Sequence, residues 1–87
     1  MKQPLNYAIL LYFTKYEEGN ADSVIEELEP EYGHYRAFNR SAVVEALMTS
    51  KENGILEEVR TELTGEDVLR VWYRVSEYGA GLIKKFL

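Results

Sequence analysis

The chain has 87 residues, a formal net charge of −5 and a hydrophobic fraction of 46%. This length suits one compact domain, and the apolar and aromatic content is too high for a disordered chain. Because the sequence contains no cysteine, disulfides, thiolate metal sites and cysteine nucleophiles are excluded. We therefore expect a single domain over residues 1–87 that folds by packing alone.

The N-terminal apolar segment is too short to cross a membrane. Tyrosine, lysine and paired glutamates interrupt it before it reaches the roughly 20 apolar residues that a span needs, and no signal-peptide cleavage pattern follows. We expect a cytoplasmic protein without membrane contact. Its acidity lowers its general affinity for phosphate, but the acidic excess lies in the first third of the chain.

Apolar residues recur at helical spacing from Leu5 to Tyr16, which predicts a first helix over residues 4–18 with Gly19 as its C-terminal stop. The opposite face of this helix carries further large apolar side chains at Tyr7, Leu10 and Leu11. A helix that is apolar around so much of its circumference is either central to the core or in contact with a partner.

Asn20 is suited to cap a second helix, which we expect to end before Pro30. The aromatic stretch 29–39 has no sustained period and is predicted to be an ordered loop. Asn39 can cap a third helix that runs to about Asn53, where a glycine follows as the C-terminal stop.

The third helix has two distinct faces. Placing its residues at intervals of about 100° turns Val43, Leu47 and Ser50 inward. The outward face is polar, with a methionine at its edge, and consists of Ser41, Glu45, Thr49, Glu52 and Met48. Such a face is either simply solvated or available to a binding partner.

After Gly54 the pattern changes to two strand-like runs around a turn, which predicts an antiparallel β-hairpin. The second run has an apolar face, with Leu69, Val71, Tyr73 and Val75, and a face that carries Arg70, Trp72 and Arg74. Ser76 can cap a fourth helix, whose apolar stripe holds Tyr78, Leu82, Ile83 and Phe86. The predicted class is mainly α with a small hairpin.

This order, α-α-α-β-β-α, resembles the winged helix-turn-helix domain of small bacterial or phage transcriptional regulators. The run AVVEALMTSKENGILEE is similar to the end of a recognition helix, and VWYRVSEYGAGLIKKFL is similar to the segment that ends the second wing strand. The positions that carry the second similarity are Tyr73, Val75, Ser76 and Gly79. All four have structural roles, so the resemblance implies the fold more directly than the function.

The resemblance also implies that the third helix enters the major groove of double-stranded DNA while nearby basic residues hold phosphates. The groove-facing candidates are then Ser41, Glu45 and Thr49, and the phosphate-contact candidates are Arg36, Arg40 and Lys51. The alternative is a solvated helix face. In addition, the tip of the hairpin carries Glu62, Glu66 and Asp67, where a DNA-contacting wing usually has basic residues.

Arg70, Trp72 and Arg74 form a second candidate surface. Tryptophan can stack on a base and arginine can hold phosphate, but both residues are also favoured in protein interfaces. Alternatively, Trp72 packs over the hairpin beneath arginine stems. Two functions therefore stay open, a DNA-binding transcriptional regulator and a winged-helix module for protein–protein interaction without DNA affinity.

Self-association is a further hypothesis, because the first and last helices carry excess apolar surface. These elements often form the dimer in small winged-helix proteins, and two copies would space two recognition helices. The candidate interface residues are Tyr7, Leu10, Leu11, Phe86 and Leu87.

No sequence pattern supports catalysis or metal binding. His34 is the only histidine, and no cysteine accompanies it to complete a ligand set. Adjacent acids such as Glu17 and Glu18 point apart on a helix, and neither a phosphate-binding glycine loop nor a nucleophile motif occurs. We expect no enzyme activity, no metal and no cofactor.

Overall fold

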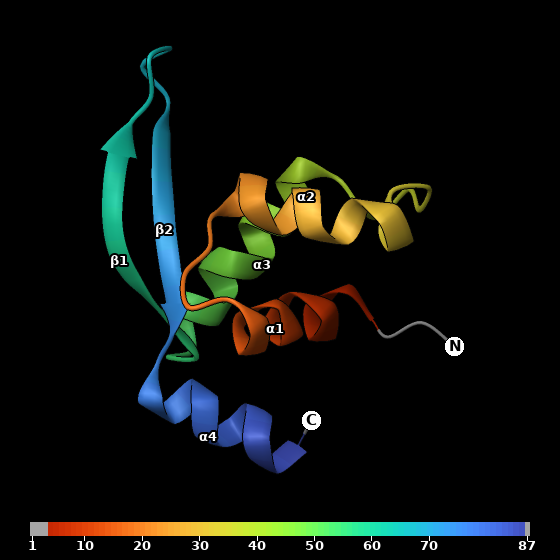
Figure 1. Ribbon diagram of the computed structural model, residues 1–87, viewed down its shortest axis with the longest axis vertical. Helices are drawn as coiled ribbons and strands as arrows, with labels where there is room; N and C mark the ends of the chain where they lie inside the picture. The colour runs from red at the N-terminus through yellow and green to blue at the C-terminus, as the bar shows by residue number, and fades with distance from the viewer. Residues whose placement is uncertain (1–3, 87) are drawn as a thin grey trace.

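The computed structural model describes residues 4–86, which form helices and one hairpin in the predicted order (Figure 1). The helices are α1 (Leu5–Lys15), α2 (Ala21–Tyr32), α3 (Arg40–Glu52) and α4 (Glu77–Phe86), and the strands are β1 (Leu56–Leu63) and β2 (Leu69–Val75). This confirms the winged helix-turn-helix as the fold class.

The two strands form an antiparallel hairpin, which we call the wing. Its register runs from Leu56 opposite Val75 to Leu63 opposite Leu69. Figure 1 shows the wing beside the helices, with its tip projecting past them and α4 at the other end of the molecule. The tip is therefore far from the apolar side chains that form the core.

The connection between α1 and α2 adds a short edge to this sheet. The Gly19 N–H donates to the Tyr73 carbonyl at 2.9 Å, and the Tyr73 N–H donates to the Gly19 carbonyl at 2.8 Å. The prediction that Gly19 stops the first helix is wrong, because the backbone already becomes extended at Tyr16 and carries the chain to β2. Gly19 is needed for close packing instead, since a Cβ there would overlap the Tyr12 ring.

One core cluster lies between α1, α2, α3 and the base of the wing. The inward face predicted for α3 is confirmed at Val43 and Leu47, which are buried in this cluster, whereas Ser50 is only half-buried. Its buried members are Ile9, Tyr12, Phe13, Val24, Val43, Leu47, Leu56 and Tyr73. Because the first three helices and both strands contribute, the helices and the wing share a single apolar interior.

Asparagine caps set the starts of α2 and α3, as predicted. The Ser23 N–H donates to Asn20 Oδ1 at 2.8 Å, and the Asn20 N–H donates to Ser23 Oγ at 2.9 Å, which completes a capping box. At α3 the Ala42 N–H donates to Asn39 Oδ1 at 2.8 Å. These caps fix the rotational phase of both helices and hence the side chains that face outward.

Helix α2 continues through Pro30 to Tyr32, so the prediction that it ends before the proline is wrong. Proline removes one backbone donor from the helix. Burial of Tyr32, together with a hydrogen bond of 2.8 Å from the Gly33 N–H to the Glu29 carbonyl, holds the last turn in place. The loop before α3 is correspondingly shorter than predicted.

Ser76 caps α4, where its Oγ accepts a hydrogen bond from the Gly79 N–H at 2.9 Å. The absence of a side chain at Gly79 lets α4 pass close to the backbone of Ile55. The predicted apolar stripe is only partly buried, since Tyr78 and Phe86 are 62% and 67% exposed. The apolar side chains of Tyr78 and Phe86 on α4 are thus not covered by other residues of the range 4–86.

We expect Gly79→Ala to lower the free energy of unfolding by about 2 kcal/mol. The added methyl group would overlap the Ile55 carbonyl oxygen, which belongs to the backbone and cannot rotate away. Urea denaturation followed by circular dichroism measures the change.

Gly81→Ala is the matched control in the same helix. No atom lies within 4 Å of a Cβ placed at Gly81. This substitution should therefore raise the free energy of unfolding by roughly 0.5–1 kcal/mol, because alanine favours the helix over glycine. Equal effects of the two substitutions would contradict the close approach at Gly79.

Candidate nucleic-acid interface

The outward face of α3 is open to solvent. Ser41, Glu45 and Thr49 are exposed, as predicted, and together line a shallow hollow on the molecular surface. Met48 and Glu52 lie in the same hollow. Hydroxyl groups both donate and accept hydrogen bonds, whereas the ionised Glu45 carboxylate only accepts them. The face can thus bond to more than one kind of polar partner.

The predicted phosphate contacts differ in their surroundings. Arg40, in the first turn of α3, forms an ion pair with Asp22 of α2. Lys51, in the last turn, has its Nζ 3.4 Å from Glu58 Oε1. Arg36 is exposed in the turn before α3 and forms no ion pair with any residue from 4 to 86. Of these three cations, Arg36 is therefore the one that contacts no carboxylate among residues 4–86.

The arginines of β2 face acidic side chains of β1. Arg74 Nε lies 2.7 Å from Glu57 Oε1, and Arg70 NH1 lies 3.5 Å from Glu62 Oε1. The strand register explains both pairs, because each arginine is directly opposite its glutamate and opposed residues lie on the same side of a sheet. The Arg70, Trp72 and Arg74 surface is therefore largely neutralised.

Trp72 packs across the wing and is half-buried. Its Nε1 donates to Glu62 Oε1 at 2.7 Å, and the Arg60 guanidinium lies 4.4 Å from the centre of its ring. The hydrogen bond from Trp72 holds the pKa of Glu62 below its usual range, and the charges of Arg70 and Arg60 act in the same direction. Folding therefore favours the ionised form of Glu62.

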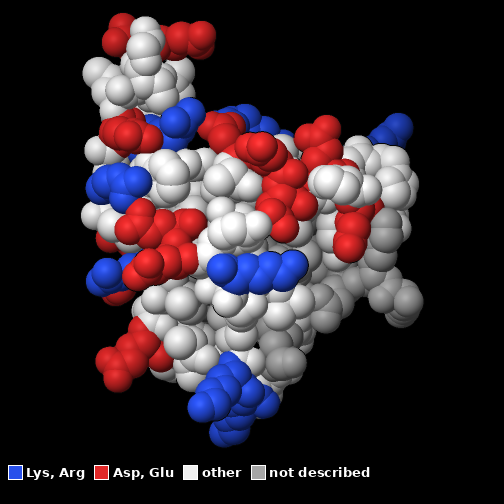
Figure 2. Space-filling view, viewed as in Figure 1, with Lys and Arg blue, Asp and Glu red and all other residues white. Residues whose placement is uncertain are grey.

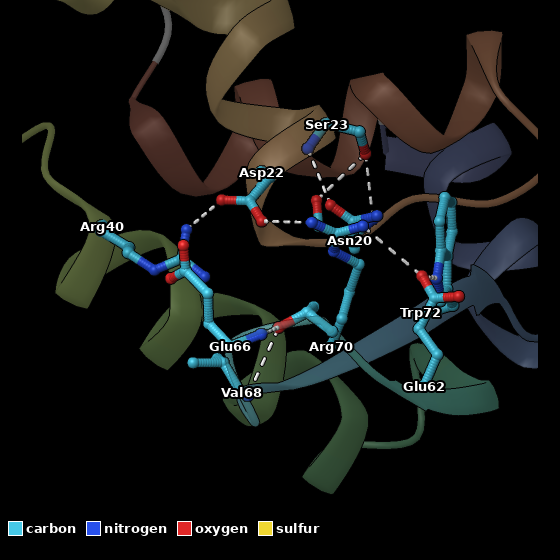
Figure 3. A network of polar contacts seen from close by, with 10 residues as sticks. Asn20, Asp22, Ser23, Arg40, Glu62, Glu66, Val68, Arg70 and Trp72 are labelled. Carbon is cyan, nitrogen blue, oxygen red and sulfur yellow. Dashed lines mark hydrogen bonds and ion pairs between the residues drawn. The ribbon is translucent and has the colours of Figure 1, made fainter.

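Asp22 links α2 to both α3 and the wing (Figure 3). Its Oδ1 pairs with Arg40, and its Oδ2 lies 3.5 Å from NH2 of Arg70. Sequence reasoning missed Asp22 because its partners are 18 and 48 residues away along the chain. Glu62 could have been found from the hairpin register, since it lies directly opposite Arg70.

The tip of the wing is both acidic and apolar. Leu63 and Leu69 are 63% and 64% exposed, and Figure 2 shows acidic side chains gathered at this tip. Leu69 lies on the apolar face predicted for β2, but it is mostly exposed to solvent. Asp67 adopts a positive φ of 60° within the turn.

The residues predicted for self-association lie in different surroundings. Leu10 lines a groove against α3, whereas Leu11 lines a groove against α2. Tyr7 and Phe86 are exposed, and Leu87 lies outside the described residues. The two leucines therefore face different neighbours.

No helix formed by residues 4–86 has the length and apolar character needed to cross a membrane. Over the same residues, no group of three or more histidine, aspartate or glutamate side chains is placed to hold a metal ion.

The same fold occurs in solved structures of bacterial transcriptional regulators. Bacillus subtilis PadR in complex with operator DNA matches with a TM-score of 0.76 and 20% identity, over 97% of this chain and 46% of that one. A PadR-like transcriptional regulator from Bacillus cereus matches with a TM-score of 0.68 and 13% identity, over 94% and 76%. A transcriptional regulator from Clostridium thermocellum matches with a TM-score of 0.67 and 15% identity, over 92% and 73%.

No protein-family model and no curated protein matches this sequence. At the identities of the structural matches, the similarity establishes the winged-helix fold. The chain spans about half the length of the Bacillus subtilis protein.

Trp72 is the sole tryptophan of the chain, so its fluorescence reports on Glu62. Because the pKa of Glu62 is lowered by folding, the contact and its stabilising effect are fully present above the unfolded pKa. Both are lost as the pH falls through the lower, folded pKa. We therefore expect the acid transition of Trp72 emission to be centred at a lower pH than the titration of an ordinary glutamate.

Glu62→Gln is the control, because it keeps a similar side chain and removes the titrating group. If the same acid transition of Trp72 emission persisted in Glu62→Gln, protonation of Glu62 would not be its cause.

Proposed function

We propose that the chain is a DNA-binding transcriptional regulator in which α3 and the preceding turn lie against double-stranded DNA. The observation that carries this proposal is the open polar surface formed by Ser41, Glu45 and Thr49. Serine and threonine hydroxyls can bond to any base edge, and glutamate can accept a hydrogen bond from cytosine N4. The similarity in fold to PadR, which was solved with operator DNA, supports DNA binding in general.

In this arrangement Arg36 and Arg40 hold phosphates near the start of α3, and Lys51 holds one near its end. Contacts of this kind position the helix in the groove without selecting a sequence. Because the net charge is −5, the protein as a whole is repelled by DNA at long range, so the interaction depends on these local cations.

We expect detectable binding to a labelled random-sequence duplex at about 20 mM salt, with log K falling by about 0.9 per phosphate contact as log salt rises. Arg40→Ala should weaken binding to all duplexes about equally, whereas Glu45→Ala should change the preference among duplexes. Fluorescence anisotropy measures both effects. Lys84→Ala, which removes a positive charge from the last turn of α4, is the matched control and should have little effect.

A winged-helix module that binds protein without DNA affinity is the second candidate. The exposed Leu63 and Leu69 beside the acidic turn favour a protein partner over phosphate at the wing tip. The protein partner would also contact either the outward face of α3 or the surface formed by Arg70, Trp72 and Arg74. The second surface suits a protein partner because tryptophan and arginine are enriched at interface hot spots. No detectable duplex binding at about 20 mM salt and tens of micromolar protein would favour this candidate.

We also propose that two copies associate, with Tyr7, Leu10, Leu11, Phe86 and Leu87 as the interface candidates. The exposed aromatic side chains of α4, Tyr78 and Phe86, support this proposal. Two-fold association would space two copies of α3 to match two half-sites on DNA.

If the dimer forms through α4, Phe86→Glu should weaken self-association by about tenfold or more, because the change introduces a charge into the apolar contact. Sedimentation equilibrium at high micromolar concentration measures the dissociation constant. Leu63→Glu makes the same kind of change at a similarly exposed position of the wing tip and should leave association unchanged. A wild-type protein that is monomeric at those concentrations would contradict the dimer.

A further inference from the structure

Asp22 lies between two arginines in a hollow enclosed by α2, α3 and β2 (Figure 3). Arg40 contributes the wall from α3, and Arg70 contributes the wall from β2. The hollow has a volume of about 120 Å³, well below the roughly 300–1,000 Å³ of sites that enclose small-molecule ligands. Its size suits a single small charged group rather than an effector molecule.

Arg70 is incompletely satisfied by its present partners. Its ion pairs with Asp22 and Glu62 are both 3.5 Å long, whereas charge-assisted hydrogen bonds usually measure about 2.7–2.9 Å. Its Nε is buried and has no hydrogen-bond partner. Arg70 therefore keeps donor capacity for a closer anionic partner at NH1 and NH2, whose present contacts are long.

The ion pairs at Asp22 are also weak enough to be exchanged. The Asp22 side chain is 48% exposed, and the Arg40 side chain is 55% exposed. Solvent and salt screen such pairs, and fixing both side chains costs conformational entropy. An incoming anion can therefore take the place of the carboxylate without breaking any part of the core.

We propose that Arg40 and Arg70 form one phosphate site shared by α3 and the wing, and that Asp22 occupies this site as an internal competitor in the free protein. This inference rests on the proposed function, because the phosphate is that of the DNA backbone. On binding, the phosphate replaces the Asp22 carboxylate between the two guanidinium groups. Since phosphates carry no sequence information, Asp22 lowers affinity for all sequences and leaves specificity unchanged.

The test compares Asp22→Asn with Glu26→Gln in the full chain. Both substitutions remove one negative charge from α2, but Glu26 is exposed and forms no ion pair with residues 4–86. In anisotropy titrations with a random-sequence duplex at about 20 mM salt, Asp22→Asn should bind about fivefold more tightly than wild type, and Glu26→Gln less than about twofold. Adding Arg70→Ala to Asp22→Asn should abolish the gain.

Each outcome separates the two proposals. If wild type binds the duplex and Asp22→Asn gains no more than Glu26→Gln, the proposed function stands and the internal competitor is refuted. If neither wild type nor Asp22→Asn binds, DNA binding itself fails and the phosphate site fails with it. Circular dichroism of each variant confirms that the loss of Asp22 from the first turn of α2 has not unfolded the helix.

Discussion

The placement of the wing depends on two backbone hydrogen bonds between Gly19 and Tyr73. They join the connection between α1 and α2 to β2, while the Tyr73 side chain lies in the core. Because Asn20 follows Gly19 directly, the same bonds fix the point at which α2 begins. Asp22 in the first turn of α2 is thereby brought beside Arg70, so the contact between α2 and the wing follows from this junction.

Most arginines of this protein form local pairs with carboxylates. Arg40, Arg60, Arg70 and Arg74 each contact a carboxylate from another element. An acidic protein can still contact a polyanion when its arginines exchange one anionic partner for another. The charge at an arginine-bearing surface therefore depends on whether its carboxylate partners remain bound to the arginines. The net charge of the protein alone does not predict it.

Local signals in the sequence predicted the starts of helices well. Asn20, Asn39 and Ser76 each precede an apolar repeat, and each accepts the backbone hydrogen bond expected of a cap. The outward face of α3 followed from the cap and the helical period together. The residues that α3 contributes to the candidate interface were thus largely predictable from the sequence.

Contacts between distant segments were not predictable from local patterns. The bonding of Gly19 to β2 and the two ion pairs of Asp22 join residues far apart in the chain, and no short spacing encodes them. The alternation along β2 was correct in phase, but it could not show that Leu69 is left mostly exposed to solvent. Likewise, the continuation of α2 beyond Pro30 rests on the burial of Tyr32 and on the hydrogen bond from Gly33 to Glu29, which the local sequence does not reveal.

The irregular register of β1 has a consequence for solubility. The outer edge of β1 is not covered by any strand within residues 4–86, and exposed edges act as templates for strands of other molecules. The shift between Glu58 and Arg60 interrupts the regular ladder, and charged side chains lie along the same strand. The glutamates that neutralise the arginines of β2 therefore also act as gatekeepers against edge-to-edge aggregation, which an apolar hairpin of the same shape would promote.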